Sequence, residues 1–133
     1  MPHRHRISTL LVAAVAALTI SVPLAVASGG GTTTRITLHP SSSFPGATGK
    51  AVSKVNGSER ELQVEVEHIK SLAGKHVKVF VNGNLFASPL VSSLGAARVE
   101  RSTENGQSVP SIHAGSTVRV RTAAGTLIVS GTF

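Results

Sequence analysis

Histidine and glutamate are the residues of this chain whose types and spacing could do chemistry. His68 and His76 flank one stretch of the chain, and Glu67 is adjacent to the first of them. A surface metal site needs three or four such ligands around one point, and two histidines separated by seven residues are not a recognised ligand spacing. Solvated loop residues are therefore the plainer interpretation. A small surface hydrolase or metal-dependent enzyme that uses His68, His76 and Glu67 stays open as the alternative.

The sequence lacks the residues or motifs that most other kinds of catalytic site require. The chain has no Cys, Trp or Tyr, and all six of its acidic residues are Glu. This excludes a cysteine nucleophile and a Cys-based metal or haem site. A serine hydrolase would need a strained nucleophile turn of the Gly-x-Ser-x-Gly kind, which the sequence does not contain. Most of the glutamates alternate with apolar residues, where pairing across a sheet is a simpler use than sugar hydrolysis. We therefore expect no enzyme and no cofactor.

The charge balance says more about partners. Thirteen Lys and Arg face six Glu in 133 residues, for a net charge of +7. Arg119 and Arg121 are two residues apart in an alternating segment, so both lie on one face of a strand, about 7 Å apart. Such a pair could contact an anion, and we expect the partner to be an anionic envelope polymer or a protein surface. Nucleic acid is not expected, because stacking platforms of Tyr and Trp are missing.

The first 27 residues have the pattern of a secretory signal peptide. Arg4 and Arg6 precede an almost continuous apolar run, and Pro23 stands just before Ala25-Val26-Ala27. A basic start, an apolar centre and an A-x-A site predict cleavage between Ala27 and Ser28, rather than a retained membrane span. The mature chain is then secreted, or loosely associated with the cell surface, with no membrane span.

The rest of the chain divides into two segments by composition. Residues 28–49 are rich in Gly, Ser, Thr and Pro, which predicts a flexible leader, with residues 35–38 as a possible edge strand. Residues 50–133 are punctuated by turn signals about every 8 to 12 residues and alternate apolar with polar side chains. This pattern predicts an all-β fold without α-helix: a single antiparallel β-sandwich of seven to eight strands, loosely immunoglobulin-like.

The alternation also predicts strand pairs. A hairpin of residues 62–67 with 76–81 would place Val66 opposite Val77 and Glu65 opposite Lys78. A second hairpin turns at residues 122–125 and would pair Val120 with Leu127. The core is expected to consist of one face of these strands: Val64, Val66, Val77, Val79, Val118, Val120, Leu127 and Val129.

The strand and turn motifs carry a resemblance to a known group of proteins. The relevant segments are residues 61–67, 79–83, 109–110, 114–120 and 125–127. Over residues 48–133 the chain resembles small exported β-modules of bacteria, of unassigned function, and its leader is similar to those of GC-rich Gram-positive bacteria. The resemblance implies an all-β secreted module and brings no catalytic residues. The expected function is that of a non-catalytic binding or structural protein of the cell envelope.

Overall fold

The computed structural model describes residues 24–28 and 31–133, and within them the chain is all-β and antiparallel. The predicted signal peptide therefore lies outside the described residues up to residue 23. Two short 3-10 helices, η1 and η2, interrupt the strands. The elements are β1 (Leu24–Ser28), β2 (Gly31–Pro40), β3 (Thr48–Asn56), β4 (Glu59–Glu67), η1 (Lys70–Leu72), β5 (Val77–Val81), β6 (Asn84–Ala87), β7 (Ala97–Ser102), η2 (Thr103–Asn105), β8 (Thr117–Thr122) and β9 (Leu127–Thr132).

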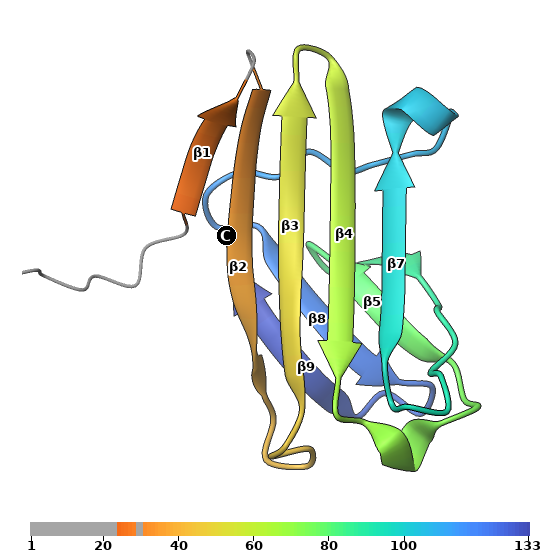
Figure 1. The fold of residues 1–133 in the computed structure, drawn as a ribbon. Coiled ribbons are helices and arrows are strands. Elements are labelled where there is room, and N and C mark those ends of the chain that lie inside the picture. The colour runs from red at the N-terminus through yellow and green to blue at the C-terminus, as the bar shows by residue number, and fades with distance from the viewer. Residues whose placement is uncertain (1–23, 29–30) are drawn as a thin grey trace, which may run out of the picture.

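Eight of these strands form one nearly closed, barrel-like sheet in the order β6-β5-β8-β9-β2-β3-β4-β7, and β1 is added beside β2. In Figure 1 the sheet folds over itself into two layers. We call β1, β2, β3, β4 and β7 the front layer, and β5, β6, β8 and β9 the rear layer. The described part of the chain contains no helix that is long and apolar enough to cross a membrane.

The two layers are joined by hydrogen bonds where β2 meets β9. His39 is paired with Ser130 and Pro40 with Val129. The joint continues into Ser41, whose N–H donates to the carbonyl of Ile128 at 2.8 Å. At the other end of the sheet, Arg101 of β7 lies over the ring of Phe86 of β6, 5.1 Å from its centroid. This cation–π contact links the two end strands, which are not paired through their backbones.

The core lies between the layers and largely matches the prediction from alternation. Seven of the eight residues expected there are buried; Leu127 is the exception and is only half-buried. The cause is a register shift between Val120 and Arg121, after which Val120 pairs with Val129 rather than with Leu127. Ile128 is fully buried instead. The hairpin itself is present as predicted, but a bulge changes its register.

The predicted hairpin of residues 62–67 with 76–81 is wrong. β4 pairs with β3 on one side and with β7 on the other, so Glu65 lies opposite Lys50 and Arg98 instead of Lys78. The short connection between Asn56 and Glu59 fixes β3 as the neighbour of β4. The chain then crosses through η1 into the rear layer, where β5 pairs with β6 and β8.

Residues 31–49 are also placed differently from the sequence interpretation. Composition assigned them to a flexible leader, with residues 35–38 as an edge strand, before a domain that starts at residue 50. A strand is present at residues 35–38, but it is longer than predicted and lies inside the sheet. In the structure β2 pairs with β3 along Gly31–Leu38, and Ile36 and Leu38 are buried in the core. Thr is a good strand former in spite of its polarity, so a segment rich in Thr can form a strand.

Candidate functional site

Arg119 and Arg121, the residues predicted to contact an anion, point outward from β8. Their neighbours Val118 and Val120 are fully buried, and alternation along the strand turns the two arginines to the opposite face. Arg119 is exposed, and Arg121 is half-buried and donates from its guanidinium to the carbonyl of Gly125 at 3.1 Å. The structure therefore places both predicted residues on one surface.

A third cation joins them from the neighbouring strand. Lys78 of β5 is the register partner of Arg121, and Phe80 is the partner of Arg119. Residues paired across antiparallel strands have Cα atoms about 4.5 to 5.5 Å apart. We call Lys78, Arg119 and Arg121 the basic face. The sequence did not predict that Lys78 lies beside the two arginines, because Lys78 was expected to pair with Glu65. The one signal for its true position is that β5 and β8 have a similar alternation of valines with other residues.

No acidic side chain of the chain lies on the rear layer. The six acidic residues are all glutamates, and all of them belong to β4, β7 or η2. They are Glu59, Glu61, Glu65 and Glu67 on β4, Glu100 on β7 and Glu104 on η2. The basic face consequently has no carboxylate side chain on its own strands to neutralise it.

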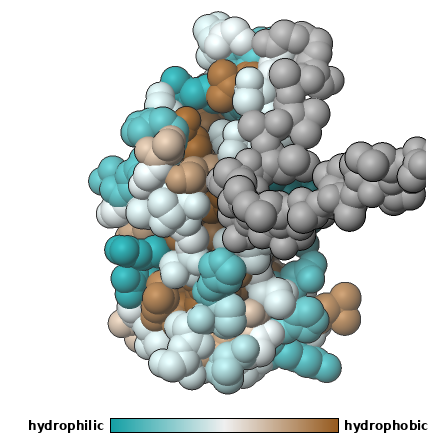
Figure 2. Space-filling model, turned by 90° about the vertical axis from the view of Figure 1, so that its left-hand side faces the viewer, coloured by the Kyte–Doolittle hydropathy of each residue, from teal (hydrophilic) through white to brown (hydrophobic). Residues whose placement is uncertain are grey.

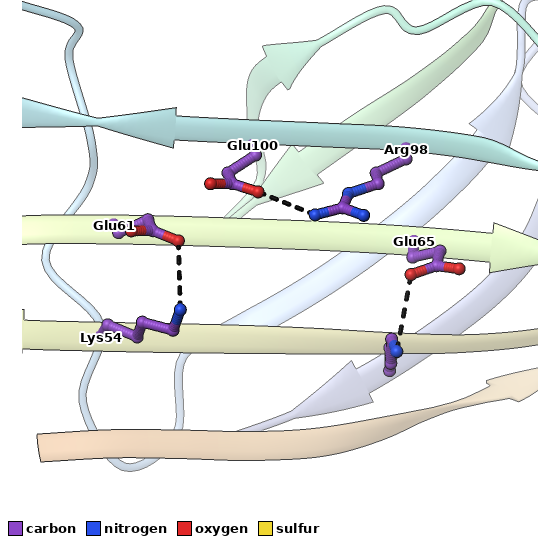
Figure 3. A network of polar contacts seen from close by, with 6 residues as sticks. Lys54, Glu61, Glu65, Arg98 and Glu100 are labelled. Carbon is purple, nitrogen blue, oxygen red and sulfur yellow. Dashed lines mark hydrogen bonds and ion pairs between the residues drawn. The ribbon is translucent and has the colours of Figure 1, made fainter. Parts of the chain in front are cut away.

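The outer face of the front layer has a different arrangement, with three of its cations beside carboxylates (Figure 3). Nζ of Lys54 lies 3.5 Å from a carboxylate oxygen of Glu61, and Nζ of Lys50 lies 3.6 Å from one of Glu65. A third pair joins Arg98 and Glu100 at 2.9 Å. Exposed pairs of this kind stabilise a fold by at most about 1 kcal/mol each. They do, however, cancel the charge that the front layer presents to a partner.

Neighbouring glutamates on β4 have pKa values that move in opposite directions. A hydrogen bond with Glu65, and then the charge of Glu65, raise the pKa of Glu67 above its usual range. The pKa of Glu65 is lowered by the same hydrogen bond and by the nearby cations Lys50 and Arg98. Glu67 therefore opposes folding at pH values above its raised pKa. Glu65 favours folding above its ordinary pKa, and this contribution is lost as the pH falls through its lowered value.

We expect an NMR titration of the glutamate side-chain carboxyl carbons to resolve this order. Glu67 should titrate above the usual range for glutamate and Glu65 below it. Replacing Glu65 by Gln removes the neighbouring negative charge, so the pKa of Glu67 should fall. Glu59 provides the control: its pKa is raised by a hydrogen bond with Glu104, and it should not respond to the change at residue 65. Equal midpoints for Glu65 and Glu67 would contradict the pairing.

The histidines of the alternative interpretation have separate partners. Nδ1 of His68 lies 3.0 Å from the hydroxyl of Thr48, and Nδ1 of His76 donates to the carbonyl oxygen of Ser88 at 2.8 Å. Both histidines and Glu67 are exposed. Among residues 24–28 and 31–133, no group of three or more His, Asp or Glu side chains could hold a metal ion. The observed geometry thus gives the metal-dependent alternative no support.

Two cavities lie at the margins of the sheet. One, of about 330 Å³, is lined by Phe86 and Arg101 and by neighbouring residues of the β5–β6 turn, at the place where the end strands meet. The other, of about 300 Å³, lies beside β2 and includes Thr32, Thr34 and Phe133 in its lining. Neither contains a pair of carboxylates. Two further cavities, of about 260 and 140 Å³, lie beside β4 and do contain them: Glu59, Glu61 and Glu104 line the first, and Glu65 and Glu67 line the second. The basic face lies outside all four cavities.

Comparisons with protein-family models, with curated proteins and with solved structures find no match to this chain. The geometry and charge of the basic face are therefore the features of the molecule that point to a function.

Proposed function

We propose that this protein is an exported, non-catalytic binding module of the cell envelope whose basic face holds an anionic polymer. The observation that carries the proposal is the distribution of charge. Lys78, Arg119 and Arg121 are neighbours on two paired strands, and every acidic side chain lies on β4, β7 or η2. A surface with charge of one sign attracts molecules of the other sign.

A polymer suits this surface better than a small anion does. The basic face is the outer side of a sheet, and its three residues line none of the four cavities described above. Arg119 and Arg121 are about 7 Å apart along β8, and Lys78 lies beside Arg121 across the strand pair. Three cations with this spacing can contact successive anionic groups of one chain. Phe80, which is half-buried among them, adds an apolar contact.

Export and fold class belong to the same proposal. The signal-peptide pattern of residues 1–27 supports secretion, with cleavage between Ala27 and Ser28. We assign the domain to the β-sandwiches, loosely immunoglobulin-like, and the crossing of two layers in Figure 1 supports this assignment. The expected location is extracellular or loosely bound to the cell surface.

The proposal predicts that the purified processed chain is retained on isolated bacterial cell wall in a salt-dependent way. Release of counterions from about three contacts should lower affinity on the order of tenfold or more between 50 and 200 mM NaCl. The double variant Arg119→Ala/Arg121→Ala should lose most of the retention at low salt. Co-sedimentation of protein with wall fragments measures both effects.

The chain offers a matched control on the front layer. The variant Lys50→Ala/Lys54→Ala removes the same amount of positive charge, but from residues paired with Glu65 and Glu61. The retention of this variant should stay within about twofold of that of the unchanged protein. A lysine whose charge is already paired with a glutamate adds little to the attraction of an anionic polymer. Retention that ignores both salt and the arginine substitutions would refute the electrostatic proposal and favour a protein partner. Equal losses in the two variants would show that net charge matters and that the basic face does not.

A further inference from the structure

β1 covers an edge of β2 that would otherwise be open. Leu24–Ser28 pairs with the first five residues of β2, from Ser28 opposite Gly31 to Leu24 opposite Arg35. β3 occupies the other side of β2, and β9 pairs with β2 only from His39 onward. In Figure 1, β1 lies at the outer side of the front layer, next to β2 alone.

Signal-peptide processing would remove this cover. Cleavage between Ala27 and Ser28 takes away four of the five residues of β1. The five residues of β2 from Gly31 to Arg35 then lack a partner strand on that side. An unpaired strand edge is a template for another strand, and proteins normally block or use such an edge.

The alternation of hydrogen bonds shows which groups become free. Asn56 and Glu59 close a two-residue hairpin, and residues in that position exchange both of their hydrogen bonds. Asn56 therefore turns its N–H and C=O groups toward β4, and its partner in β2, Gly31, turns its own groups away from β3. Every second residue repeats this direction, so the same applies to Thr33 and Arg35. These groups face β1 before processing and have no strand to bind after it.

We propose that, in the processed chain, this edge of β2 pairs with the same edge of a second copy around a twofold axis. The inference rests on the export proposed above and adds an assembly step to it. The partner's five residues take the place of β1 in the same antiparallel direction. With Thr33 on the axis, Thr32 lies opposite Thr34 of the other copy, and Gly31 lies opposite Arg35. The front layers of the two copies then form one continuous sheet.

The sequence of this edge is complementary to itself. Like charges directly opposite each other destabilise a strand pair, and here the one charged residue, Arg35, meets a glycine. The other three positions are threonines, whose β-branched side chains pack well against each other across strands. Isologous pairing of this kind gives a closed dimer rather than an open chain of molecules.

A cavity beside the same edge also favours a covering strand. It has a volume of about 300 Å³, and Thr32 and Thr34 line it together with the half-buried side chains of Ile112 and Phe133. Figure 2, which views this side of the molecule, shows apolar residues at the surface among polar ones. The second copy brings its own Thr32 and Thr34 to the rim of this cavity and so narrows its opening to water.

Sedimentation velocity of the chain of residues 28–133 tests the pairing. This chain keeps every residue of the core described above, which runs from Ile36 to Val129, and its fold can be checked by circular dichroism. It should show a monomer–dimer equilibrium that depends on concentration. Thr33→Pro removes one N–H on the open edge and should leave only monomer, with an unchanged circular dichroism spectrum. Thr33→Val keeps the N–H and the β-branched shape and should still form the dimer.

A second chain separates the role of β1 from that of the threonine. A protein that begins at Leu24 retains the covering strand and should be monomeric at concentrations at which the processed chain is a dimer. A processed chain that stays monomeric, or a dimer that persists in Thr33→Pro, would overturn the inference. Either result leaves the proposed function intact, because sedimentation involves no polymer and wall retention is measured separately.

Discussion

Replacing Leu38 by alanine should lower the free energy of unfolding by about 2–5 kcal/mol, the range seen when a buried Leu is cut to Ala. Leu38 is 1% exposed and lies near the end of β2, next to the joint with β9. Two glycines make room for it: Gly49 is its register partner on β3, and Gly131 approaches from β9. Its side chain fills the space that these glycines leave, so the loss of three carbon atoms creates a cavity. Urea denaturation measures the change.

Leu94 provides the matched control for this substitution. It is 85% exposed, and Leu94→Ala makes the same chemical change at a site with little packing. Its effect should stay within about 0.5 kcal/mol. A Leu38→Ala variant as stable as Leu94→Ala would mean that residues 31–49 are a leader after all, with β2 outside the folding unit.

Gly95→Ala should destabilise the fold on the order of 3 kcal/mol, for two combined reasons. Gly95 has a φ of +81°, in the left-handed region that side chains disfavour, and an added Cβ would lie 2.6 Å from the backbone nitrogen of Lys70. The carbonyl of Gly95 also accepts a hydrogen bond from the N–H of buried Ile69 at 3.0 Å. Relief of the clash would therefore pull apart the segment that carries the chain from the front layer to the rear layer.

Gly106 is the control that has the left-handed backbone conformation of Gly95 without its close contact. Its φ of +72° is similar, but an added Cβ would meet nothing within 4 Å. Gly106→Ala should cost only about 1–2 kcal/mol, the penalty for a left-handed residue with a side chain. Thermal unfolding of both variants gives the comparison. Equal midpoints would indicate that the close approach to Lys70 has no consequence for stability.

The faces of the strands could be predicted from the sequence because alternation is a local property. Val77, Val79, Val118 and Val120 are buried as expected, since the phase of each strand is set by its own residues. Leu127 departs from the prediction because the bulge next to Arg121 advances the phase by one residue. Such a bulge depends on the length of the turn and leaves little trace in the apolar pattern.

Strand partners could not be predicted in the same way. Charge and apolar pattern agreed on a pairing of Glu65 with Lys78, yet Lys50 and Arg98 satisfy Glu65 equally well. Pairing is a long-range choice among strands that all alternate, so local complementarity does not single out one partner. In the candidate site, too, the local feature could be predicted from the sequence and the strand pairing could not. Arg119 and Arg121 share a face because they are two residues apart, whereas Lys78 reaches them only through the pairing of β5 with β8.

The joint between β2 and β9 has a consequence for the order in which the molecule can fold. It ties His39 to Ser130, residues far apart in the chain, and among the strands that the structure describes it is the one place where the two layers pair. Contacts between such distant residues slow folding, and two-state β-proteins dominated by them fold in milliseconds to seconds. During synthesis, which starts at the N-terminus, β2 is complete long before β9 has been made. The two layers can therefore join by backbone pairing only after the last strand has been made.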